Sequence, residues 1–377
     1  MNNNNCAICG KNFQNVQDSN EHIIPNAIGG RKKIKHFICV NCNNKTGTEW
    51  DAELIKQLEP MCLYLRVKRE RGETNPQIFS TSDGQTIRLK NDGTMEYPKP
   101  LIQEKYCEDT KSGTIHASLR SKKEAKQLID GYKRKGYKIQ NEEEILNSLE
   151  TKQSYLSESV NFNISIGGDK AGRSIVKSLL AFAVDNDVSL DNCELAVKYL
   201  REKDTEPCFG YWNDRDFIKN REIGMPTHCL GIRGIKKQSL LVGYIEFFGT
   251  WKIVSCLSDS YNGEDFLSSY AINPINGKEV KIDIDLDILY SEIRDSYDDK
   301  MVSTKTLEDD ISSIIKTAQE SHAKQEQNRV FTNAVTKAFQ SCGAEYGEAL
   351  TKEHIDKLNS IVWKEIEPYI KYLLIKK

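Results

Sequence analysis

Two cysteine pairs decide how the first part of this chain folds: CAIC at residues 6–9 and CVNC at residues 39–42. Each pair presents two thiolates on one short turn, and four thiolates in two close pairs are what a tetrahedral zinc site requires. A redox role is disfavoured because no βαβ pattern surrounds either pair. The sequence therefore predicts a structural zinc site, whose ligands are Cys6, Cys9, Cys39 and Cys42.

The segment around these pairs is too short to build a conventional hydrophobic core. Residues 6–45 are rich in Cys, Gly and Asn, and such a segment usually needs a metal to fold. The other seven cysteines are scattered without a second close spacing, so we assign them no chemistry.

Length and composition place the chain among soluble globular proteins. Its 377 residues are enough for two or three domains, and 29% of them are charged. No apolar run approaches the length of a membrane span, and the first residues, MNNNN, lack the features of a signal peptide. We therefore expect a cytoplasmic protein without a membrane partner, in a compartment where thiols stay reduced.

The charge is unevenly distributed along the chain. The formal net charge is only -2, but the first 72 residues hold eleven lysines and arginines against seven aspartates and glutamates. A local excess of cations matters more than the total charge for a nucleic-acid partner.

Hydrophobic periodicity predicts an α+β protein. We expect a small zinc-stapled domain over residues 1–72, which ends in a helix from about residue 49 to 71 with a kink or break at Pro60. A larger α+β domain over residues 73–310 and a helical C-terminal region over 311–377 follow. Antiparallel strands are predicted at 240–248, 251–257 and 280–286, and C-terminal helices at 312–324, 330–339 and 352–374.

A histidine beside a carboxylate lies between the two cysteine pairs, in EHIIP at residues 21–25. Hydrolysis of a phosphodiester needs a group that takes a proton from water and a cation that stabilises charge on the phosphoryl and leaving oxygens. The His22 imidazole and a divalent ion can meet these needs. Since neighbouring residues of a strand point to opposite faces, a local bend or the metal geometry has to bring both to the site.

Together these motifs resemble the zinc-ribbon-bearing HNH endonucleases with a Glu-His-Ile-x-Pro core; the similarity covers about residues 6–55. The resemblance implies a ββα-metal active site that cuts DNA with Mg²⁺, Mn²⁺ or another divalent ion. It also implies that His22 is the general base, and that Glu21 and Asn43 bind the catalytic ion. Residues 34–36 stand where the middle Asn of the motif is expected, so His36 either fills that role or is a surface residue.

Basic residues flank this motif, and two interpretations stay open for them. Contacts with phosphates would give salt-sensitive binding that is independent of DNA sequence, whereas the alternative is a solvated loop. The predicted DNA-binding residues are Arg31, Lys32, Lys33, Lys35 and Lys45.

A second glycine-rich motif, at residues 167–174, imitates a phosphate-binding loop. A true P-loop has lysine where Arg173 stands, so we interpret the stretch as an ordinary strand, turn and helix.

The main functional hypothesis is a metal-dependent DNA endonuclease with a C-terminal specificity or sensor domain, in bacterial defence or a mobile element. One alternative is a non-catalytic zinc-ribbon module that binds nucleic acid or protein. Another is an HNH effector that is silent until a small signalling molecule binds the larger domain. The last helical stretch is the candidate surface for homo-oligomerisation.

Overall fold

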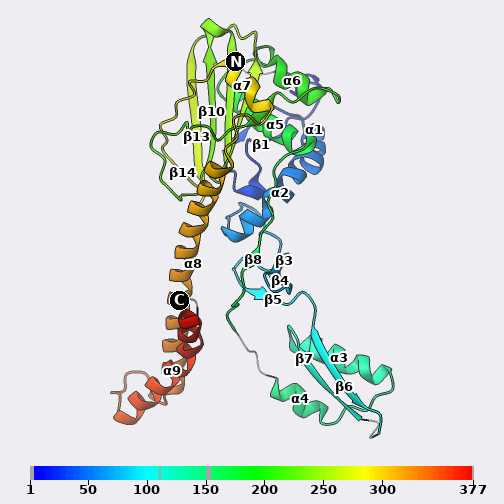
Figure 1. Cartoon of the computed structure of the whole chain (residues 1–377), viewed down its shortest axis with the longest axis vertical. Coiled ribbons are helices and arrows are strands. Elements are labelled where there is room, and N and C mark those ends of the chain that lie inside the picture. Colours follow the sequence, from blue (N-terminus) through cyan, green and yellow to red (C-terminus); the bar gives the residue numbers. More distant parts are fainter. Residues whose placement is uncertain (1–3, 110–111, 150–153, 376–377) are drawn as a thin grey trace. The chain divides into compact units, whose positions relative to one another are not determined.

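The computed structural model describes residues 4–109, 112–149 and 154–375. They form two compact units, each made of separate stretches of the chain (Figure 1). The first unit covers the chain through Asn75, Asn91–Gly93 and Asn163–Ser321, and the second covers Pro76–Lys90, Thr94–Phe162 and the chain from His322 onward. The N-terminal region and the strand-rich region thus share one unit, while the boundaries at residues 72 and 310 stay predictions.

The α+β class is confirmed, and short elements build the N-terminal region. Strands β1 and β2 pair antiparallel, and helices enclose a buried apolar cluster beside them. The last helix continues through Pro60 but ends at Tyr64, because Arg66 adopts the left-handed region with φ of 56°. The predicted extension of this helix to residue 71 is therefore wrong. The elements are β1 (Glu21–His22), η1 (Asn26–Ile28), β2 (Lys33–Ile34), α1 (Val40–Thr46), the π-helical turn η2 (Gly47–Asp51) and α2 (Ala52–Tyr64).

A six-stranded antiparallel sheet forms the centre of the first unit, in the order β14-β13-β10-β11-β12-β9. Both faces are covered: along β11, Leu241 and Ile245 belong to one core cluster, and Val242 and Tyr244 to the other. The period of two along a strand explains this division. The strands are β9 (Phe209–Tyr211), β10 (His228–Ile235), β11 (Leu240–Phe247), β12 (Trp251–Ser258), β13 (Phe266–Asn273) and β14 (Lys278–Glu279).

The predicted strand at residues 280–286 is not formed. Its alternating apolar residues instead reflect one-sided burial, since Ile284 and Leu286 pack into the second core cluster without a strand ladder. A single antiparallel bridge joins Ile284 to Ile218. The two predicted strands at 240–248 and 251–257 are confirmed as the antiparallel neighbours β11 and β12.

Helix α5 (Asp169–Asp185) packs between the N-terminal region and the sheet, and almost all of its residues are buried. It begins inside the glycine-rich stretch, as expected of an ordinary turn and helix, and the strand before it is confined to Val160–Asn161. The other helical elements of this unit are η3 (Leu190–Asn192), α6 (Glu194–Arg201), η4 (Lys236–Gln238) and α7 (Tyr290–Tyr297).

Hydrogen bonds tie the N-terminal region to the later parts of the first unit. The buried His228 ring of β10 donates from Nε2 to the carbonyl oxygen of Ile28 at 2.7 Å and accepts at Nδ1 from the Phe248 amide at 3.2 Å. The Gln57 side chain exchanges two hydrogen bonds with the backbone of Gly167. The N-terminal region is therefore built into a larger core, which also contains residues of α5 and the sheet.

The second unit contains a four-stranded sheet in the order β5-β4-β3-β8, a separate hairpin and helices. The long helix α8 (Thr304–Ser341) contributes residues to both units and is continuous, where two helices were predicted. The last helix, α9, agrees with the predicted range of 352–374. The elements are β3 (Gln77–Thr81), β4 (Thr86–Leu89), β5 (Met95–Glu96), β6 (Leu101–Cys107), β7 (Ser112–Ser118), α3 (Lys122–Arg134), α4 (Glu142–Ser148), β8 (Val160–Asn161) and α9 (Lys352–Ile375).

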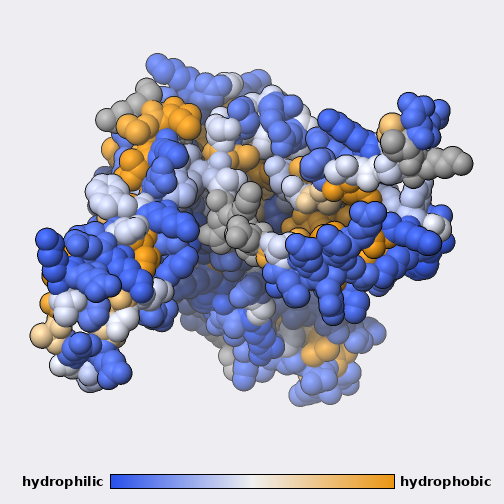
Figure 2. Space-filling view, turned by 90° about the horizontal axis from the view of Figure 1, so that it is seen from below, coloured by the Kyte–Doolittle hydropathy of each residue, from blue (hydrophilic) through white to orange (hydrophobic). Residues whose placement is uncertain are grey.

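The described surface is polar over most of the face seen in Figure 2, with hydrophobic residues gathered in separate patches. None of the helices in the described parts of the chain has the length and hydropathy needed to cross a membrane.

Candidate active site

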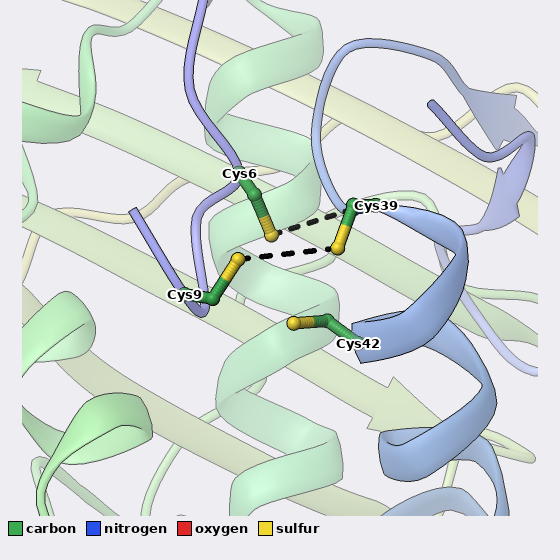
Figure 3. A group of neighbouring side chains, drawn as sticks. All are labelled: Cys6, Cys9, Cys39 and Cys42. Carbon is green, nitrogen blue, oxygen red and sulfur yellow. Dashed lines mark hydrogen bonds between the residues drawn. The ribbon is translucent and has the colours of Figure 1, made fainter. Parts of the chain in front are cut away.

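The four predicted zinc ligands come together at one point (Figure 3). Their sulfur atoms all lie within 4.8 Å of one another, and the Cys9 and Cys39 sulfurs are 3.9 Å apart. Four sulfurs around a zinc ion with bonds of about 2.3 Å would lie about 3.8 Å apart. Cys39 immediately precedes α1 and Cys42 lies in its first turn, so the helix fixes these two cysteines relative to each other. The cluster fits a structural zinc ion.

The pKa values of these thiols are shifted in both directions. Burial acts to raise the pKa of Cys9, but hydrogen bonds from the Lys11 backbone and the neighbouring cysteines lower it below its ordinary value. Burial raises the pKa of the Cys6 and Cys42 thiols above their ordinary value. Because a zinc ligand has to be a thiolate, binding of the ion releases protons and offsets the cost of burying these groups.

The β1–β2 hairpin places Glu21 and His22 on opposite faces. In its register Glu21 is opposite the buried Ile34, while His22 is opposite the exposed Lys33. The two side chains accordingly have different partners, Lys177 for Glu21 and Glu70 for His22.

Glu21 lies in a buried ion-pair network with a residue far along the chain. The Lys177 ammonium of α5 is 2.6 Å from Glu21 Oε1 and 2.5 Å from Asp51 Oδ2. Ser174, one turn earlier on α5, donates from its hydroxyl to Asp51 Oδ1 at 2.5 Å. Burial alone would lower the pKa of Lys177, but the carboxylates of Asp51 and Glu21 raise it, so the ammonium stays charged. Helix α5 therefore supplies the buried polar partners of the N-terminal region.

His22 lies on the accessible side of the hairpin, with its side chain 25% exposed. Its Nε2 is 2.8 Å from Glu70 Oε2, and the Lys33 ammonium is 2.9 Å from the same oxygen. The hydrogen bonds from Lys33 and His22 lower the pKa of Glu70 to about 2, so this carboxylate is ionised at neutral pH.

Asn43 is half-buried on α1, directly after the last cysteine. Among the described residues no hydrogen bond is recorded for its side-chain amide, so its oxygen is available as a ligand. A carboxylate and an amide oxygen are suitable donors for Mg²⁺, which keeps several of its waters in protein sites. The structure records no direct contact between Asn43 and either Glu21 or His22.

The five predicted DNA-binding residues fall into two groups. Within the described chain Lys35 and Lys45 are exposed without a recorded ion pair. The other three have internal partners: Arg31 donates to Asn26 and to the carbonyl of Lys68, Lys32 pairs with Asp185, and Lys33 pairs with Glu70.

His36 is an exposed turn residue with φ of 56°. Asp18 accepts a hydrogen bond from its backbone amide at 3.0 Å and lies 3.3 Å from its ring Nδ1. The side chain thus helps to fix the loop that leads to the second cysteine pair.

With this geometry in view, comparison with protein families gives one match. Residues 6–59 match the family model of the HNH endonucleases. The N-terminal region is an HNH endonuclease domain. No match was found among curated proteins or among solved structures. The resemblance seen in the sequence is confirmed for this domain, which occupies about one seventh of the chain.

Sequence reasoning missed three residues that organise the HNH domain: Asp51, Glu70 and Lys177. A signal existed for Lys177, because it is a cation inside a helical stretch whose neighbours are almost all apolar. Such a lysine needs a buried carboxylate partner. No comparable signal marked Glu70, since it lies in a charged segment at residues 66–71.

Proposed function

We propose that this protein is a metal-dependent endonuclease that hydrolyses phosphodiester bonds in DNA. The observation that carries the proposal is the accessible His22, located in a domain that matches the HNH endonucleases and contains a zinc-fitting cluster. An HNH domain implies a nuclease with a DNA substrate, and the finer assignments below extend that inference to named residues.

His22 is the proposed general base. Its imidazole is half-buried on the hairpin, close enough to solvent to take a proton from a water molecule, and a positioned base of this kind contributes about 10²–10⁴-fold to a rate. A zinc ion held by the four cysteines would join the turn at residues 6–9 to the start of α1 and so support the domain that carries the ring.

Glu21 and Asn43 are the proposed ligands of the catalytic ion. Glu21 uses Oε1 for Lys177, and no bond of its Oε2 is recorded in the described structure, which leaves that oxygen for a cation. A bound Mg²⁺ or Mn²⁺ would stabilise the negative charge that develops on the phosphoryl and leaving oxygens. Because the Glu21 and His22 side chains lie on opposite faces of β1, this ligand role has to be tested separately from that of the base.

Lys35 and Lys45 are the proposed primary phosphate contacts, since they are the exposed members of the predicted set for which the described residues record no ion pair. Arg31, Lys32 and Lys33 would contribute mainly to the local field, because their charged groups already have partners.

The direct test is cleavage of supercoiled plasmid DNA by the zinc-loaded full-length protein. Nicking that appears with Mg²⁺ or Mn²⁺ and disappears with EDTA is the expected result. DNA binding without cleavage under every metal condition would contradict the proposal and favour a non-catalytic zinc-ribbon module. A parallel reaction with cyclic nucleotides as probes tests for an activator, since cleavage that needs such a ligand identifies a gated nuclease.

The wider setting is proposed from the resemblance alone: a cytoplasmic nuclease in bacterial defence or a mobile element. The region at 73–310 is proposed to provide specificity or sensing. The region at 311–377 is proposed to provide self-association. On α8, Phe331, Val335 and Phe339 recur every fourth residue and are each at least 40% exposed, as an oligomeric helix face would be. A molecular mass that stays monomeric at all concentrations would contradict self-association.

A further inference from the structure

We propose that Glu70 is a positioning residue, which holds His22 as the Nε2–H tautomer and so leaves Nδ1 as the proton-accepting nitrogen. This inference rests on the proposed function of His22 as a base. It concerns a residue outside the segment at 6–59 that matches the HNH endonucleases.

The hydrogen bond itself determines which nitrogen carries the proton. Glu70 Oε2 is 2.8 Å from His22 Nε2, and the carboxylate is also bound to Lys33. An ionised carboxylate can only accept hydrogen bonds, so a neutral His22 has to donate from Nε2. Its Nδ1 then keeps its lone pair, which is the state that a general base requires.

The chain holds Glu70 at this point through its backbone. Its amide donates to Asn26 Oδ1 at 2.9 Å, and Asn26 lies in η1, directly after the EHIIP motif. Arg31 donates to the same Oδ1 at 3.2 Å and to the Lys68 carbonyl at 2.5 Å. The segment after α2 is therefore fastened at two points to the loop between β1 and β2, and the position of Glu70 does not depend on its side chain alone.

Lys33 keeps the carboxylate between itself and the ring. It is the cross-strand partner of His22, so both side chains lie on the same face of the hairpin, and both contact Oε2. Such a carboxylate orients the imidazole and raises its basicity, as acidic partners of histidines do elsewhere in proteins.

The opposite role would be inhibitory. A carboxylate that occupies both His22 and Lys33, here called a plug, could exclude a DNA phosphate from these two basic groups. The two roles predict effects of opposite sign. Removal of a positioning residue slows cleavage, whereas removal of a plug accelerates it and strengthens DNA binding.

The first measurement compares plasmid nicking rates of the wild type with Glu70→Ala, Glu70→Gln and Glu73→Ala. Glu70→Ala should lower the maximal rate by about 10- to 100-fold, with little change in the DNA concentration at half-maximal rate. Glu70→Gln retains an oxygen that accepts from Nε2–H and should recover most of the loss. Glu73→Ala removes the same charge from an exposed carboxylate three residues along and should cut at the wild-type rate. A rate for Glu70→Ala equal to or above that of the wild type would overturn the proposal.

The second measurement reads the tautomer without reference to activity. Protein with ¹⁵N-labelled histidine carries six imidazoles, and the difference from His22→Ala identifies the resonances of His22. The wild type should show a protonated Nε2 and an unprotonated Nδ1, and Glu70→Ala should shift this ring toward a mixture. An unchanged tautomer in Glu70→Ala would refute the role of Glu70. A wild type that cuts no DNA would instead refute the nuclease proposal, while the ring spectrum would still decide whether Glu70 sets the tautomer.

Discussion

The two faces of the β1–β2 hairpin differ in the way that they are held. The anchored face, made of Glu21, Asp51 and the Ile28 carbonyl, contacts Lys177 and His228 in a buried environment. The open face, made of His22, Lys33 and Glu70, is partly exposed, and its polar groups all come from residues 22–70. Adjacent residues of one short strand therefore serve two surfaces.

This difference separates stability from chemistry. A buried carboxylate whose partner is removed costs several kcal/mol, whereas exposed ion pairs contribute little. Changes at Lys177 and Asp51 should therefore alter unfolding, and changes on the open face should alter cleavage and DNA binding. A change at Glu21, which is also the proposed ligand of the catalytic ion, should affect both.

Loss of the zinc ion should disrupt both faces of the hairpin, so that stability and cleavage are lost together. Structural zinc contributes about 10–16 kcal/mol to the folding of small zinc domains, and here the four cysteines join the turn at residues 6–9 to the start of α1. We expect Cys39→Ser, or treatment with a strong chelator, to expose the N-terminal region to proteolysis and to eliminate cleavage. Cys107→Ser, a change at an exposed cysteine outside the cluster, is the control. Retention of protease resistance and one equivalent of zinc by Cys39→Ser would contradict the assignment.

Lys177→Met should break the anchored face alone. The substitution keeps the volume but leaves the Glu21 and Asp51 carboxylates buried without their cation, which costs about 3–5 kcal/mol. Denaturant unfolding of the zinc-loaded protein measures this loss, and Lys170→Met at an exposed position of the same helix should leave the midpoint unchanged. A similar midpoint for Lys177→Met would mean that the network does not hold the domain.

His228 gives the anchored face a pH dependence. Burial lowers its pKa from 6.5 to about 4, so the unfolded chain binds the proton more readily than the folded one. The stabilisation is complete above pH 6.5 and is lost as the pH falls toward 4, by up to about 3 kcal/mol. A proton on Nδ1 would also face the Phe248 amide that now donates to it. The unfolding free energies of the wild type and His228→Gln should converge over this range, and parallel curves would be evidence against the effect.

Lys35 and Lys45 test the proposed DNA contacts of the domain, with a smaller effect. The Lys35→Ala/Lys45→Ala double variant should reduce the salt dependence of DNA binding by about two in the log–log slope. Its unfolding free energy should stay within about 0.5 kcal/mol of the wild type. Titrations at several salt concentrations provide the slope. An unchanged slope would show that Lys35 and Lys45 do not contact DNA phosphates.

Local patterns in the sequence were sufficient for much of this structure. The spacing of Cys6, Cys9, Cys39 and Cys42 predicted their assembly, because ligand spacing on tight turns leaves few arrangements. Helix α9 and strands β11 and β12 also followed from periodicity.

Long-range pairing was not predictable in the same way. Glu21 and Lys177 are separated by 156 positions, and no local pattern relates them. At residues 280–286 the alternation of apolar and polar residues corresponds to burial of one side of the segment. Such alternation does not show whether a strand ladder forms, so the predicted strand was wrong. The roles of Glu21, His22 and Asn43 stay predictions, because contacts locate side chains without measuring their reactivity.

Cleavage by His22→Ala is the most direct test of the central claim. Plasmid nicking in Mg²⁺ or Mn²⁺ should fall by at least about 10²-fold relative to the wild type. Zinc content and the unfolding midpoint should stay the same, because His22 belongs to the open face. Nicking at the wild-type rate by this variant would contradict the assignment of His22 as the base.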